Sequence, residues 1–119
     1  MTQEELRQRL KDFAIRIIKM SDTLPLTPSG QIIGKQVVRS GTSPGANYRA
    51  ACLGKSDKDF LNKLKMVEEE LDETAYWLEL IIQLKYIRPE LMENLYKENI
   101  ELLKIIVRTI TTMKKKIRE

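Results

Sequence analysis

The side chains that could do chemistry in this chain are mainly carboxylates, because the sequence contains no histidine. It therefore lacks the Glu-x-x-His pairs of di-iron bundles, histidine zinc sites and histidine-based triads. Glu68, Glu69, Glu70, Asp72 and Glu73 form an acidic cluster. Paired carboxylates can bind a hard cation, but we interpret the cluster as a strip of solvated or interface-facing charges. We predict no metal, no cofactor and no enzymatic activity.

Cys52 is the only cysteine, so no intrachain disulfide can form. Without a histidine to activate its thiol, we interpret Cys52 as a small buried packing residue. The N-terminal sequence MTQEELRQRLKDF lacks the apolar stretch of roughly 7–15 residues that a signal peptide requires. No apolar run approaches the roughly 20 residues of a membrane span. We therefore expect a cytoplasmic protein.

Basic and acidic residues are segregated along the chain, although the net charge is only +4. Residues 1–66 contain 12 Lys/Arg and 6 Asp/Glu, residues 67–113 contain 5 and 10, and residues 114–119 contain 4 and 1. The first half (residues 1–66) and the tip (residues 114–119) are thus basic, and the segment between them is acidic. Because clustered cations release counterions from phosphates, this pattern predicts weak binding of RNA or DNA without sequence preference.

The candidate nucleic-acid-binding residues are Arg9, Arg16, Arg49, Lys114, Lys115, Lys116 and Arg118. For the tip, the alternative is a favourable interaction with the negative end of its own helix. For the first half, the alternative is subunit assembly, with basic helices facing the acidic helices of another copy. We predict for Arg39 a structural ion pair with Glu69 or Glu73, on a surface that includes Trp77 and is a candidate oligomer interface.

Helices must position these side chains, because apolar residues recur at alternating spacings of three and four. The first helix is predicted from the capping-box pair Thr2 and Glu5 to Thr23. Its apolar stripe consists of Leu6, Leu10, Phe13, Ile17, Met20 and Leu24.

The second helix is predicted to begin at Pro28, where the missing N–H costs nothing and the preceding threonine can act as the cap. Pro44 would remove a hydrogen bond within this helix, at about 3 kcal/mol if nothing adapts. We therefore predict a kink or a restart at Ser43, with segments near 28–41 and 44–54. The residues expected to face the core are Ile33, Val37, Ser40, Asn47 and Ala51.

The third helix is predicted from the cap Ser56, with Asp59 in its first turn, to about Lys85. The fourth opens at Pro89. Short connections force neighbouring helices to run antiparallel, so residues 1–119 are predicted to form one all-α domain, an up-down-up-down four-helix bundle. At about 1.5 Å per residue, it should be about 40 Å long.

The expected core seam of the fourth helix is Met92, Tyr96, Asn99, Leu103, Ile106, Ile110, Met113 and Ile117. For Asn99 we predict exposure or a wet edge of the core. Several apolar residues lie partly outside the seams: Ile15, Ile18, Trp77, Leu80, Leu84, Ile100 and Val107. They belong either to a broad core-facing stripe or to a second packed face, which would imply a homo-oligomer.

Four segments resemble a known bacterial family of four-helix bundles: QVVRSGTS at 36–43, GANYR at 45–49, KSDKDF at 55–60 and ETAYWLEL at 73–80. Members of this family were first noticed as open reading frames in intervening sequences of 23S ribosomal RNA genes. The resemblance covers nearly the whole chain. Two positions depart from the family pattern: Ala50 stands where an acidic residue is usual, and Pro44 stands where a β-branched residue is usual.

The resemblance implies a ring-like homopentamer, similar to the accessory protein of diversity-generating retroelements. That relative is basic, binds nucleic acid and partners a reverse transcriptase, so nucleic acid and a protein such as a reverse transcriptase are possible partners here. The function expected is a non-enzymatic, oligomeric accessory protein that binds nucleic acid weakly. The alternative is a structural or adaptor protein that acts only through self-assembly and protein contacts.

Overall fold

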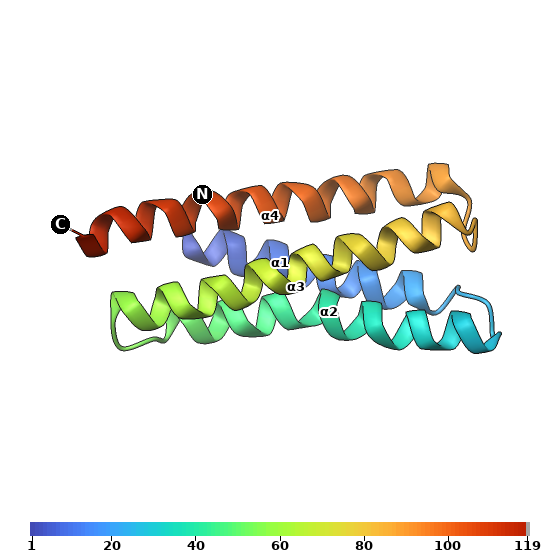
Figure 1. Ribbon diagram of the computed structural model, residues 1–119, viewed down its shortest axis with the longest axis horizontal. Helices are drawn as coiled ribbons and strands as arrows, with labels where there is room; N and C mark the ends of the chain where they lie inside the picture. The colour runs from blue at the N-terminus through green and yellow to red at the C-terminus, as the bar shows by residue number, and fades with distance from the viewer. Residues whose placement is uncertain (119) are drawn as a thin grey trace.

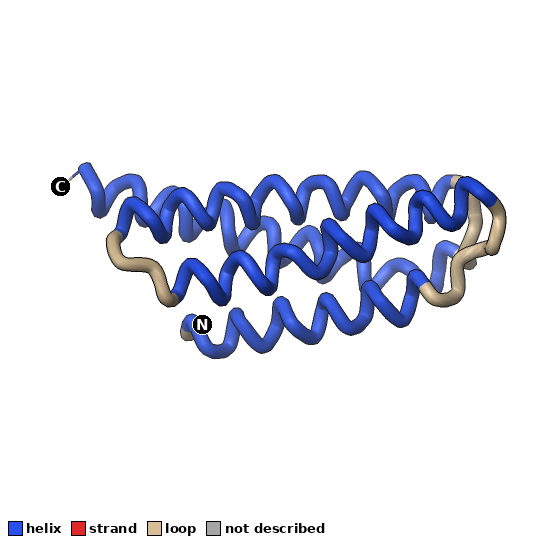
Figure 2. Tube along the Cα trace, turned by 90° about the horizontal axis from the view of Figure 1, so that it is seen from below, coloured by secondary structure: helices blue, strands red, loops and turns tan. Residues whose placement is uncertain are grey.

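In the computed structural model, which describes residues 1–118, the chain folds into four helices packed lengthwise in one bundle. Helix α1 spans Gln3–Ser21, α2 Pro28–Cys52, α3 Asp57–Gln83 and α4 Pro89–Arg118. Helices that follow one another run in opposite directions, and α4 packs against both α3 and α1 (Figure 1, Figure 2). The predicted all-α four-helix bundle is confirmed.

The helices are staggered along the bundle axis. The bundle measures 51 Å by 21 Å by 21 Å, which is longer than the predicted length of about 40 Å. At one end the last turns of α4 extend past the start of α1, and at the other end the start of α2 extends past the start of α4 (Figure 1). The basic tip of the chain therefore projects from one end of the bundle.

The helix starts follow the predicted signals. The hydroxyls of Thr2, Thr27 and Ser56 each accept a hydrogen bond from the backbone N–H three residues later, at 3.0, 3.2 and 3.1 Å. Pro28 and Pro89 occupy the first positions of their helices, as predicted. The first three helices end within two residues of their predicted ends, which is the usual uncertainty of such boundaries.

Of the two alternatives predicted at Ser43, the restart is wrong, because α2 continues from Pro28 to Cys52 with Pro44 inside it; the kink stays a prediction. A proline ring crowds the turn that precedes it, but that turn contains only small residues, among them Ser40 and Gly41. Pro44 is itself buried, and α2 packs against α1 on one side and α3 on the other. Tertiary packing of this kind supplies most of the stability of a helix and overrides the local preference.

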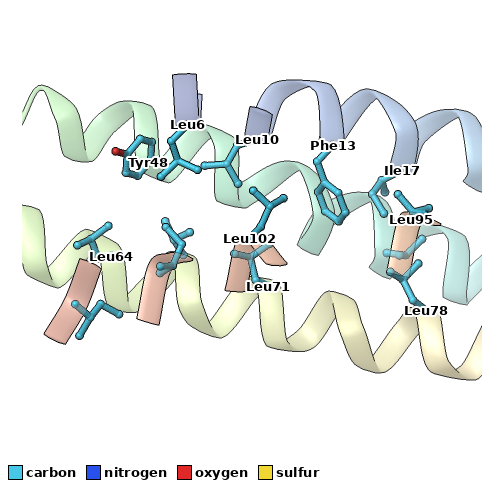
Figure 3. Close-up of a cluster of buried hydrophobic side chains, with 14 of the residues drawn as sticks. Leu6, Leu10, Phe13, Ile17, Tyr48, Leu64, Leu71, Leu78, Leu95 and Leu102 are labelled. Atoms are coloured by element: carbon cyan, nitrogen blue, oxygen red, sulfur yellow. The ribbon is translucent and has the colours of Figure 1, made fainter. Parts of the chain in front are cut away.

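The core fills the space between all four helices. Figure 3 shows leucines of α1, α3 and α4 pointing toward one another, with Phe13 and Tyr48 beside them. On α4 Leu95 and Leu102 are buried in place of the predicted Tyr96 and Leu103, and the predicted Ile117 is exposed, whereas the rest of the predicted seam is buried. On α2, Tyr48 is buried in place of Asn47, which is half-buried. The buried large side chains of α1 and α3 are Leu6, Leu10, Phe13, Ile17, Leu61, Leu64, Val67, Leu71, Leu78 and Ile81.

The prediction for Asn99 is also wrong, because its side chain is completely buried. Its Nδ2 donates a hydrogen bond to the backbone oxygen of Leu71 at 3.1 Å, and its Oδ1 has no partner within residues 1–118. The hydroxyls of Ser40 and Thr74 lie 2.9 Å apart, and they too are buried. Each helix from α2 to α4 thus contributes a polar side chain to the core. None of the four helices is both long enough and apolar enough to cross a bilayer.

Candidate nucleic-acid interface

The fold gathers basic residues at one end of the bundle, which we call the basic end. The α2–α3 connection and the C-terminus of α4 lie at this end, and the N-terminus of the chain lies toward it (Figure 1, Figure 2). Lys116 Nζ lies 3.5 Å from Asp57 Oδ2, which ties the end of α4 to the start of α3. The members of the basic end, all exposed, are Arg49, Lys55, Lys58, Lys114, Lys115, Lys116 and Arg118.

The cations of the basic end outnumber its carboxylates, although Asp57 and Asp59 alternate with Lys55 and Lys58 at the start of α3. The Lys116–Asp57 contact joins two largely exposed side chains, and such pairs contribute little free energy because water screens them. Neither Lys114 nor Lys115 forms an ion pair with any carboxylate in residues 1–118. Five of the seven predicted nucleic-acid-binding residues therefore lie together. Lys55 and Lys58 join them only through folding, which the sequence reasoning did not anticipate.

Arg9 lies elsewhere and has a partner inside the chain. Its Nε and Nη2 donate to the two carboxylate oxygens of Glu98, both at 2.7 Å, in a bidentate pair between α1 and α4. The hydrogen bond with Glu98 raises the pKa of Arg9 above its usual value. Arg16 is exposed two turns further along α1, away from the basic end. Neither arginine is therefore part of the candidate interface.

Arg39 joins α2 to α3 through two carboxylates. Its guanidinium contacts Glu73, and its Nη1 lies 3.1 Å from Glu70 Oε2. The Nε1 of Trp77 also donates to Glu73 Oε2, at 2.9 Å. The predicted pair with Glu73 is present, whereas Glu69 is exposed and its neighbour Glu70 takes the second position. Glu69 also lies one turn before Glu73, so helical spacing alone does not separate the two candidates. Glu70 is half-buried on the side of α3 that meets Arg39 of α2, whereas Glu69 is exposed.

A groove with a volume of about 690 Å³ runs between α1 and α2. Its walls carry Arg7 and Lys11 from α1 and Arg49 from α2, and Glu4 is the one carboxylate that lines it. The sequence reasoning missed Arg7 and Lys11 as candidates. Their spacing of four residues places them on one helix face, but the sequence did not show that this face borders α2 at Arg49.

Cys52 is half-buried beside Tyr48, rather than fully buried as predicted. Burial, and after it the neighbouring Cys52 thiol, raises the pKa of Tyr48 to about 12. Tyr48 therefore stays protonated at neutral pH, and its ring packs against Phe60 with centroids 6.3 Å apart. Residues 1–118 contain no group of three or more Cys, Asp or Glu side chains arranged to hold a metal ion.

Comparison with known proteins agrees with the fold and the sequence pattern. A protein of unknown function from the S23 ribosomal protein family of Bacteroides thetaiotaomicron VPI-5482, known from its crystal structure, superposes with a TM-score of 0.83 and is 35% identical. The match covers 93% of this chain and 99% of that one. No functionally curated protein matches the chain. Residues 3–108 match the family of the 23S rRNA-intervening sequence protein, and this chain therefore belongs to that family.

Proposed function

We propose that this chain is a non-enzymatic accessory protein that binds RNA or DNA weakly, without sequence preference, and does so as a homo-oligomer. The observation that supports binding is the basic end, where exposed Lys and Arg side chains of α2, α3 and α4 lie at the same end of the bundle and outnumber the carboxylates Asp57 and Asp59. Such a surface attracts phosphates through counterion release, which requires no base contacts.

Oligomer formation is supported by apolar side chains on the outward face of α3. Tyr76 is exposed and Leu80 half-buried near the end of α3, and the exposed C-cap Leu84 continues this stripe at the same spacing of four residues. Soluble monomers rarely expose contiguous apolar surface, so a second copy of the chain is the occupant we propose for this face. A cyclic assembly would repeat the basic end in every subunit and raise a weak affinity by multivalency. The ring-like pentamer implied by the family resemblance is the form we propose.

The test is a titration of labelled oligo(dT) and oligo(U) across a salt series. Replacing Lys114, Lys115 and Lys116 with Gln should weaken binding and reduce the slope of log K against log salt by about 2, because each phosphate contact on a single strand contributes about 0.7. The matched control removes three exposed lysines away from the basic end: Lys19, Lys35 and Lys104. It should bind like the wild type.

The outcome at low salt separates this proposal from its alternative. No binding at about 50 mM salt would overturn it, since the electrostatic attraction is strongest there. If the solution mass nevertheless exceeds the 13.9 kDa of one chain, an adaptor that acts through self-assembly and protein contacts becomes the better account. The observation that supports this alternative is the set of exposed apolar side chains near the end of α3. A reverse transcriptase is the protein partner that the family resemblance suggests for either account.

A further inference from the structure

The groove between α1 and α2 has an unbalanced charge. Arg7 and Lys11 rise from one wall and Arg49 from the other, against the single carboxylate of Glu4. Arg9 and Arg39, by contrast, face carboxylates within the bundle. None of the three groove cations forms an ion pair within residues 1–118. Converging cations in a concave surface focus the field there and attract an anion.

The groove is deepened by a glycine of α2 that the packing of α2 against α1 does not require. Gly45 lies inside α2, where glycine costs about 1 kcal/mol relative to alanine. A Cβ at Gly45 would lie 3.6 Å from the backbone oxygen of Leu10, which is an ordinary contact. A Cβ at Gly41, one turn earlier, would lie only 2.8 Å from Ile17 Cγ2. Packing against α1 therefore requires glycine at position 41 but not at position 45.

Small residues at positions 45 and 46 leave room between the cationic walls. Ala46 is exposed and lines the groove with only a methyl group. No aromatic side chain lines the groove, so it offers no surface on which a base could stack. An occupant would be held by its negative charge between residues 4–14 of α1 and residues 42–53 in and just after α2, which suits a chain of phosphates better than a single base or an apolar helix.

We propose that this groove holds the phosphodiester backbone of the nucleic acid that binds at the basic end. Arg49 belongs to both surfaces, so a strand bound at the basic end can continue between α1 and α2 without a gap. Arg7 and Lys11 contact the phosphates from one side and Arg49 from the other, while the bases point outward. This inference rests on the proposed function, and it adds a path for the strand and three residues that hold it.

A substitution that fills the groove without changing its charge provides the first test. Ala46→Leu should weaken oligo(dT) binding about tenfold, because the larger side chain lifts the backbone away from the cations on both walls. Asn94→Leu is the control: it introduces a leucine at an exposed position near the start of α4, away from both the groove and the basic end. It should bind like the wild type. Thermal unfolding and solution mass, measured on both variants, verify that fold and assembly are unchanged.

Charge removal provides the second test. Replacing Arg7 and Lys11 with Gln should reduce the salt slope of oligo(dT) binding by about 1.4, or about 0.7 for each lost phosphate contact. If both groove variants bind like the wild type while the Lys114–Lys116 variant binds more weakly, the groove inference is overturned and the proposed function stands. If the wild type does not bind at about 50 mM salt, both fall. A third arm titrates inorganic phosphate alone: saturable phosphate binding that Ala46→Leu abolishes, with oligo(dT) binding unchanged, would assign the groove to a small anion and overturn the inference.

Discussion

Asn99 places an unpaired polar atom in the core. Its Nδ2 bonds the Leu71 backbone oxygen, but Oδ1 is buried without a partner within the described chain. A buried acceptor without a hydrogen bond costs about 1–3 kcal/mol, and an apolar residue of similar shape can replace such a group at no loss. We therefore expect the amide to lower the stability of the bundle and to contribute specificity, since a shift in the register of α4 against α3 would separate Nδ2 from that oxygen.

We predict that Asn99→Leu raises the free energy of unfolding by about 1 kcal/mol, because it removes the unpaired acceptor and fills the same space. Urea denaturation would measure the change. Asn94→Leu is the control, since Asn94 is exposed five residues earlier on α4 and such surface changes stay within about 0.5 kcal/mol. A clear loss of stability in Asn99→Leu would mean that Oδ1 is satisfied in solution.

At the scale of the elements, the crossing of α1 and α2 depends on one glycine. A Cβ at Gly41 would lie 2.8 and 2.9 Å from Cγ2 and Cγ1 of Ile17, whose side chain is fully buried and cannot move away. Close packing of the two helices therefore requires hydrogen alone at this position. At Gly45, one turn later, the same added atom meets ordinary contacts.

The same substitution should have opposite effects at these two glycines. Gly41→Ala should lower the free energy of unfolding by about 1–3 kcal/mol, the usual cost of overpacking. Gly45→Ala should raise it by about 0.5–1 kcal/mol, because alanine loses less backbone freedom in a helix. Thermal or urea unfolding would measure both. A change of the same sign at the two positions would contradict the packing of α1 on α2 described above.

At the scale of the whole molecule, the Arg9–Glu98 pair connects the first helix to the last. The carboxylate is 18% exposed and the arginine side chain 33%, so water screens the pair only in part. Bidentate geometry strengthens an arginine–carboxylate pair, whereas exposure weakens it. This pair helps to keep α1 closed against α4, on the side of the bundle where no loop joins the two helices.

A double-mutant cycle with Arg9→Gln and Glu98→Gln should give a coupling energy of about 1 kcal/mol, near the upper limit for partly exposed pairs. The coupling energy should fall as salt is added, because dissolved ions screen the attraction between these two partly exposed charges. The Lys97–Glu93 pair within α4, with both side chains more than 60% exposed, provides the comparison. It should couple by less than about 0.5 kcal/mol, and equal values for the two pairs would contradict the role assigned to Arg9.

The helix starts could be predicted from the sequence because their signals are local. A Thr or Ser cap and a first-turn proline act within four residues, and each one marked its helix correctly. The phase of α4 could not be predicted, since Leu102 and Leu103 are both apolar and only contact with α3 decides which is buried. The restart at Pro44 could not be ruled out from the sequence, because the rule that proline breaks a helix is local, whereas packing against α1 and α3 stabilises α2.

For the candidate site, the sequence indicated which charges were abundant but not which were already paired. The C-terminal lysines were identified because they are consecutive. Arg9 and Arg16 are candidates because they lie two turns apart on one helix face, yet Arg9 forms an ion pair with Glu98, which lies 89 positions away along the chain. The groove was missed for the same reason, because Arg7 and Arg49 become neighbours only when α1 and α2 pack.

The ion pair between α2 and α3 has an optical consequence. Trp77 is the only tryptophan in the chain, and its indole donates to the same Glu73 oxygen that Arg39 contacts. Indole fluorescence responds to nearby charge and to water, so the intrinsic emission of the protein reports on one contact between two helices. Recorded during a titration with nucleic acid, it would reveal without any added label whether binding at the basic end disturbs the middle of the bundle.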